Sequence, residues 1–104
     1  MEGSRPETPL YEDLSHRWAL VTGTNGPIGR GVALALGERH AKQILVYRQH
    51  RDEAMKTAEL VRRAGGEATV VQADVTRFDE VERLRERVRQ ITGRLDVVVN
   101  GVGD

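Results

Sequence analysis

The sequence predicts an α/β fold in which four parallel strands form one doubly wound sheet and three helices connect them. Short apolar runs alternate along the chain with longer segments whose apolar residues recur at helical spacing. A glycine-rich stretch, residues 23–29, follows the first apolar run directly. Alternating strands and helices favour a parallel sheet with right-handed crossovers.

The first predicted strand and the first predicted helix flank the glycine-rich stretch. Residues 18–22 are almost continuously apolar, as expected for a parallel strand that is covered on both faces. After Pro27, which is tolerated in the first turn of a helix, we expect a helix that ends near His40. Its buried face should be broad and should carry the apolar residues that recur at helical spacing, Ile28, Val32, Ala35 and Leu36, widened by Ala33 and Leu34.

The other elements follow at short intervals. We expect strands at residues 43–47, 68–73 and 95–100, and a second helix at residues 52–64 that is stopped by two glycines. The buried face of the second helix should be formed by Ala54, Ala58 and Val61. Thr76 and Asp79 have capping-box-like spacing ahead of a third helix, whose apolar face comprises Val81, Leu84, Val88 and Ile91. Doubly wound connections give the spatial strand order 3-2-1-4.

Length and composition indicate one small domain without a strong global charge. Of the 104 residues, we expect residues 1–15 to form a flexible N-terminal extension and residues 16–104 to form the folded domain. Sixteen basic and sixteen acidic residues cancel, which argues against nucleic-acid or membrane-surface binding. The sequence has no cysteine, and its three histidines are scattered, so no metal site is expected. No signal peptide or long apolar span is evident, so we expect a cytoplasmic protein.

The glycine-rich stretch has the features of a phosphate-binding turn. Gly23 permits a sharp turn, and Gly29 lacks the Cβ that would hold the helix away from the sheet or a phosphate away from the backbone. Free N–H groups at the start of the following helix can face a diphosphate. An ordinary strand-to-helix loop is the alternative. The predicted strand order favours a dinucleotide site, because this turn and residues 100–103 then meet at the carboxyl ends of neighbouring strands.

Several motifs in residues 18–103 resemble those of the short-chain dehydrogenases/reductases. Residues 22–29 resemble the cofactor loop T-G-x-x-x-G-I-G of that family, Asp74-Val75 resembles its adenine contact, and residues 100–103 are similar to its N-N-A-G motif. The resemblance implies a Rossmann-like fold, truncated here after the fourth strand. It also implies an oxidoreductase that transfers hydride between NADP(H) and a carbonyl or alcohol substrate. Residues 47–48, 65–68 and 72–75 look most like 3-oxoacyl-acyl-carrier-protein reductases.

The same resemblance implies a set of cofactor-binding residues. Asp74 would accept a hydrogen bond from the adenine amino group, with backbone contact at Val75, although a plain turn residue is the alternative. Asn100 would border the nicotinamide ribose or would instead tie neighbouring strands together. The full expected set is Gly23, Asn25, Gly26, Ile28, Gly29, Arg48, Asp74, Val75, Asn100 and Gly101.

Arg48 indicates which nicotinamide dinucleotide is preferred. It follows the second strand, at the place where the adenosine ribose would lie, and neither Tyr47 nor Arg48 supplies an acid to hold both ribose hydroxyls. A guanidinium suits a 2′-phosphate, so NADP is favoured, with NAD as the other possibility. An ordinary exposed arginine at a strand end is the alternative.

Two substitutions depart from the family pattern near the cofactor. Pro27 stands in place of the middle glycine, which removes one N–H donor and fixes φ near −65°. We expect Gly26 to restore some freedom to the turn. Gly101 and Val102 replace the asparagine and alanine of N-N-A-G.

The sequence contains no catalytic residues of the family type. The family's serine, tyrosine and lysine lie beyond the fourth strand, and no tyrosine here has Tyr-x-x-x-Lys spacing. We therefore expect these 104 residues to be inactive alone. We also expect residues 95–100 to form an exposed apolar edge that binds a protein partner or a second copy. The alternative function is a non-catalytic module that binds dinucleotide or pairs with a partner.

Overall fold

The computed structural model describes residues 13–24 and 26–101 and contains, within them, one four-stranded parallel sheet and three helices. The strand order is β3-β2-β1-β4, as predicted. The strands and helices, in chain order, are β1 (Trp18–Thr22), α1 (Pro27–Glu38), β2 (Lys42–Tyr47), α2 (Arg51–Arg63), β3 (Glu67–Gln72), α3 (Phe78–Ile91) and β4 (Val97–Asn100).

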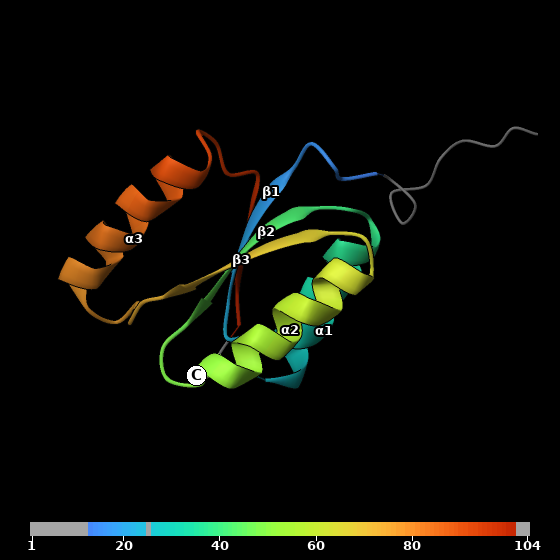
Figure 1. Cartoon of the computed structure of the whole chain (residues 1–104). Helices are drawn as coiled ribbons and strands as arrows, with labels where there is room; N and C mark the ends of the chain where they lie inside the picture. The colour runs from blue at the N-terminus through green and yellow to red at the C-terminus, as the bar shows by residue number, and fades with distance from the viewer. Residues whose placement is uncertain (1–12, 25, 102–104) are drawn as a thin grey trace, which may run out of the picture.

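Helices cover both faces of the sheet. Figure 1 shows α1 and α2 side by side on one face and α3 on the other. Alternate residues of β1 therefore enter different cores: Val21 packs with α1 and α2, and Leu20 packs with α3. The register places Leu20 opposite Ile44 on one side and Val98 on the other. The near-continuous apolar sequence of β1 is explained by this burial on both faces.

Helix α2 buries the face that its sequence predicts. Ala54, Ala58 and Val61 are fully buried, and Thr57 is buried between them. The small residues at positions 54 and 58 allow the helix to lie close to the sheet.

The buried face of α1 agrees with the prediction only in part. Ile28 is 77% exposed and Ala35 is also exposed, whereas the buried positions are Gly29, Ala33 and Gly37. A Cβ at Gly37 would lie 3.1 Å from Cγ1 of Val61, so α1 and α2 pack closely through a stripe of small residues. Ala33 is buried as predicted, and Leu36 is half-buried against the core. The apolar periodicity did not indicate Gly29 and Gly37, because close packing at these positions requires glycine, which carries no hydrophobic signal.

The predicted capping box at the start of α3 is also wrong. Arg77 occupies the N-cap position in an extended conformation, so Thr76 lies before the cap. The Thr76 hydroxyl donates instead to Oδ1 of Asp74 at 2.6 Å. Glu80, in the first turn of α3, accepts a hydrogen bond from the Asp74 N–H at 2.7 Å. The first turn of α3 is therefore connected to the segment that follows β3.

Strand β4 lies at one edge of the sheet and is poorly covered. Val98 is 63% exposed, and Leu95 and Val97 are each more than a third exposed. Val98 is on the same face as Leu20, but α3 does not extend over it. None of the helices in the described part of the chain is long and apolar enough to cross a membrane.

Candidate functional site

The carboxyl ends of the strands surround an open cavity of about 650 Å³. Its walls are formed by the ends of β1, β2 and β4 and by the segment that follows β3. Six of the ten predicted cofactor-binding residues line it, namely Gly23, Arg48, Asp74, Val75, Asn100 and Gly101. Gly26, Ile28 and Gly29 form the start of α1 and do not line the cavity. Asn25 lies outside the described residues.

Glycines are required where the loops after β1 and β4 meet. Gly23 has φ +68°, and a Cβ there would lie 2.5 Å from the carbonyl oxygen of Gly101. A Cβ at Gly29 would collide with the carbonyl oxygen of Gly23. A Cβ at Gly101 would lie 2.6 Å from the carbonyl oxygen of Thr22. Any side chain at these positions would push the loop away from the helix or from β4.

The N-terminal end of α1 offers two backbone donors beside this loop. The first helical hydrogen bond joins the N–H of Arg30 to the carbonyl of Gly26 at 3.0 Å. Pro27 has no N–H, so the N–H groups of Ile28 and Gly29 are the ones that the helix itself does not use. Gly26 is extended, with φ −95°, a conformation open to any residue. The expectation that Gly26 gives the turn beside Pro27 additional conformational freedom is therefore wrong.

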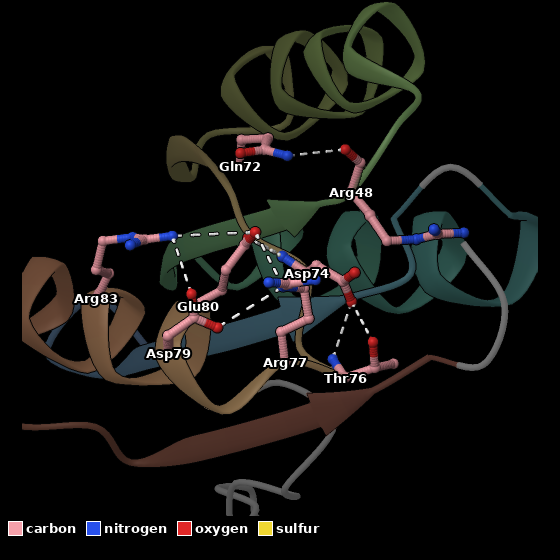
Figure 2. A network of polar contacts seen from close by, with 8 residues as sticks. All are labelled: Arg48, Gln72, Asp74, Thr76, Arg77, Asp79, Glu80 and Arg83. Atoms are coloured by element: carbon pink, nitrogen blue, oxygen red, sulfur yellow. Dashed lines mark hydrogen bonds and ion pairs between the residues drawn. The ribbon is translucent and has the colours of Figure 1, made fainter.

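Asp74 is held as a carboxylate on the wall of the cavity. Its Oδ1 accepts hydrogen bonds from the N–H and the hydroxyl of Thr76, at 3.0 and 2.6 Å. These bonds, helped by the positive charges of Arg48 and Arg77, lower the pKa of Asp74. Figure 2 shows the Asp74 carboxylate between Thr76 and Arg48. At neutral pH this group is an ionised hydrogen-bond acceptor.

Glu80 fixes the backbone at Asp74, and sequence inspection did not identify it. Besides accepting the Asp74 N–H, its carboxylate lies 3.9 Å from Arg77 and 4.0 Å from Arg83. Figure 2 shows these charged side chains gathered at the start of α3. A glutamate six residues after an aspartate has no recognised motif, so the sequence offered no signal for this contact.

Arg48 lies just beyond β2, with an exposed side chain on the cavity wall. Its carbonyl accepts a hydrogen bond from Nε2 of Gln72 at 3.1 Å, which ties the end of β2 to the end of β3. Its guanidinium is close enough to Asp74 to lower the pKa of that carboxyl. The cavity therefore has a cation and an anion on neighbouring walls.

Asn100 ties the edge strand β4 to its neighbour β1. Its Oδ1 accepts a hydrogen bond from the hydroxyl of Thr22 at 2.8 Å, and the two residues are paired across β1 and β4. Asn100 therefore has the structural role that was considered for it, which is to tie neighbouring strands together. Among the described residues, no group of three or more His, Cys, Asp or Glu side chains is arranged to hold a metal ion.

Relatives of this chain include fungal and bacterial proteins. A hydroxynaphthalene reductase-like protein Arp2 from Metarhizium anisopliae is 36% identical over 100 residues, which cover 96% of this chain. A solved structure of a putative short-chain dehydrogenase/reductase from Burkholderia xenovorans is 40% identical, with a TM-score of 0.80 over 89% of this chain. The RhlG/NADP active-site complex from Pseudomonas aeruginosa is 30% identical, with a TM-score of 0.78 over 93% of this chain.

The match covers only part of each relative. The chain spans 37% of the length of the Metarhizium and Burkholderia proteins and 38% of that of the Pseudomonas protein. The family model for short chain dehydrogenases matches residues 17–104, nearly the whole chain. The protein therefore belongs to the short-chain dehydrogenase family.

Proposed function

We propose that this chain is the NADP(H)-binding portion of a short-chain dehydrogenase/reductase type oxidoreductase. The observation that carries the proposal is the cavity at the carboxyl ends of the strands, where the tight turn at Gly23 meets Arg48 and Asp74. Ligands of doubly wound sheets bind at this edge, where the strand order reverses between β1 and β4.

The side chains and backbone groups around the cavity suit the parts of a dinucleotide. The N–H groups of Ile28 and Gly29, at the start of α1 beside the cavity, would donate to the diphosphate, aided by the positive end of the α1 dipole. The Asp74 carboxylate would accept a hydrogen bond from the adenine amino group. Gly101 and Asn100 would border the nicotinamide ribose. The bound dinucleotide would supply the hydride donor or acceptor of the family's chemistry.

Arg48 is the residue that would distinguish NADP from NAD. Its guanidinium is exposed on the wall formed by the end of β2, where a ribose 2′-phosphate can accept paired charge-assisted hydrogen bonds. The relative from Pseudomonas aeruginosa is described as an NADP complex, which is consistent with this preference.

Hydride transfer is proposed to need residues that these 104 positions do not contain. No tyrosine has a lysine four positions later, and the resemblance implies that such a pair supplies the acid and lowers its pKa. We therefore expect no dehydrogenase or reductase activity from this chain alone. The resemblance to 3-oxoacyl-acyl-carrier-protein reductases and the cytoplasmic location remain predictions.

Titration of the purified chain with NADPH and NADH tests the cofactor proposal. In Arg48→Gln, loss of a charge-assisted contact should weaken NADPH binding by about tenfold or more and leave NADH binding unchanged. Arg63→Gln is the matched control, because Arg63 is an exposed arginine on α2 that pairs with Glu59. It should bind both nucleotides as the wild type does.

Two results would contradict the proposal. If the folded wild-type chain binds neither nucleotide, its role as a dinucleotide-binding portion is wrong. If it prefers NADH, or if Arg48→Gln binds NADPH with wild-type affinity, the role of Arg48 is wrong.

We also propose that a protein partner or a second copy of the chain covers the edge formed by Leu95 to Asn100. Within residues 13–24 and 26–101, β4 is paired with β1 alone, and Val98 presents an apolar side chain that is 63% exposed. Uncovered apolar edge strands tend to pair with other chains.

A further inference from the structure

A buried hydroxyl on α2 contacts the backbone of the glycine-rich loop. Thr57 is fully buried, and its Oγ1 donates to the carbonyl of Thr24 at 2.9 Å. Thr24 is also fully buried, and it directly follows Gly23 on the cavity wall. The contact joins residues 33 positions apart and connects α2 to the candidate cofactor loop.

Arg30 determines how this hydroxyl is oriented. Its Nε donates to Oγ1 of Thr57 at 2.8 Å, which occupies a lone pair of the hydroxyl oxygen. Its Nη2 donates to both the carbonyl and the carboxylate of Glu53, at 3.1 and 2.8 Å. One guanidinium on α1 thus binds three groups on α2 and fixes the two helices relative to each other.

The hydroxyl hydrogen has two candidate acceptors, and the surroundings favour Thr24. The Glu53 carbonyl is 3.1 Å from Oγ1, but it already accepts from Arg30 and from the helical N–H four residues later. The Thr24 carbonyl is nearer, at 2.9 Å, and an unpaired buried carbonyl costs roughly 1–3 kcal/mol. The Thr57 hydrogen bond to Thr24 is therefore the favoured arrangement.

The loop at Thr24 has little room to relax. A Cβ on Gly29 would lie 3.3 Å from the Cα of Thr24 and would collide with the carbonyl of Gly23. Because Gly29 packs directly against Gly23 and Thr24, a shift of the Thr24 carbonyl would also move Gly23 and the free N–H groups of Ile28 and Gly29. A displacement of a few tenths of an ångström would misalign donors for a diphosphate.

We propose that Thr57 is a positioning residue for dinucleotide binding, whose hydroxyl, oriented by Arg30, holds the glycine-rich loop through the Thr24 carbonyl. The inference rests on the proposed function, because the loop is taken to bind a dinucleotide. Thr57 does not line the cavity, so it acts only through the loop.

Substitutions at position 57 separate the hydroxyl from the packing that it makes. Thr57→Val keeps the shape and removes the hydroxyl, whereas Thr57→Ser keeps the hydroxyl and removes a methyl group. Thr69→Val is the matched control, since Thr69 is a half-buried threonine in β3. Each variant is titrated with NADPH below its melting temperature, and its thermal unfolding is recorded separately.

We expect Thr57→Val to weaken NADPH binding about tenfold, Thr57→Ser to stay within about twofold of the wild type, and Thr69→Val to bind normally. Rescue by serine is the decisive result, because Thr57→Ser lacks the methyl group of threonine, so retained affinity must come from the hydroxyl. If Thr57→Val binds normally, or if Thr57→Ser is as weak as Thr57→Val, the inference is wrong.

A variant of Arg30 tests the proposal even if Thr57→Val does not fold. Arg30→Met keeps the hydroxyl but removes the donor that orients it, so we expect weaker NADPH binding in a folded protein. Unchanged affinity in Arg30→Met would overturn the orienting role. If the wild-type chain itself binds no dinucleotide, the proposed function fails first. If the wild type binds NADPH and the Thr57→Val and Arg30→Met variants bind it with the same affinity, the inference about Thr57 is wrong while the proposed function stands.

Discussion

His40 shows how one residue can limit stability through its backbone. It lies just after α1 with φ +72°, in the left-handed region that favours glycine. Its N–H donates to the carbonyl of Gly37 at 2.9 Å, and the N–H of Ala41 donates to that of Leu36 at 3.1 Å. This pair of bonds is the Schellman arrangement, in which glycine commonly occupies the left-handed position.

We expect His40→Gly to stabilise the domain by about 0.5–1 kcal/mol, because the strained backbone angle costs glycine nothing. Thermal unfolding at neutral pH measures the change. Glu38→Gly is the control, since position 38 is the last residue of α1 and should lose stability when it becomes glycine. A lower melting temperature for His40→Gly would show that the imidazole contributes more than the strain removes.

At the level of elements, Asp96 connects the beginnings of β1 and β4. Its carboxylate accepts the N–H of Trp18 at 2.9 Å and the guanidinium of Arg94 at 2.9 Å, and its own N–H donates to the carbonyl of Trp18. The Trp18 N–H, followed by Arg94 and Arg17, lowers the pKa of Asp96. The ionised side chain therefore helps to hold β4 against β1.

The lowered pKa predicts how stability depends on pH. The contribution of Asp96 is complete above its unfolded pKa, near about 4, and is lost as pH falls through the lower folded pKa. Asp96→Asn should therefore reduce the free energy of unfolding at pH 7 and flatten its decline at acidic pH. Urea unfolding at pH 7 and pH 3 provides the measurement. If Asp96→Asn loses the same free energy of unfolding at pH 7 and at pH 3, the contribution of Asp96 is not electrostatic.

For the whole molecule, the exposed edge at β4 predicts self-association or partner binding. The urea midpoint of the wild-type chain should rise with protein concentration, because association stabilises the folded state by mass action. Val98→Lys should abolish that dependence, since it places a charge on the edge strand. Phe78→Lys is the control, because Phe78 is equally apolar and 79% exposed but lies on α3.

Light scattering gives the oligomeric state under the same conditions. A monomeric wild-type chain that unfolds cooperatively, with several kcal/mol of stability at every concentration, would contradict the need for a partner.

Much of the fold was predictable from periodicity. The bounds of β1 were predicted correctly, and the strand order followed from the alternation of elements. The predicted start of β4 was two residues early, because Leu95 and Asp96 precede the paired strand. For the candidate site, Arg48 was singled out from its place after the second strand and Asp74 from its resemblance to the family's adenine contact. Both line the same cavity, and their cofactor-binding roles remain predictions.

Other features depended on contacts between distant residues. Thr57 and Glu80 each touch the candidate site from a neighbouring helix, and no local spacing indicates such contacts. The two glycines of the buried α1 stripe were missed for a related reason. Glycine carries no hydrophobic signal, although Gly29 and Gly37 allow α1 to approach the loop after β1 and α2.

The sequence by itself determined the alternating elements, the order of the strands and the place of the glycine-rich turn, because these follow from local apolar patterns and from glycine's freedom at positive φ. Only the tertiary structure decided which residues support that turn. The Thr57 hydroxyl and the Arg30 guanidinium reach Thr24 and α2 across 33 and 27 positions of sequence, and only the packing of α1 against α2 brings them together.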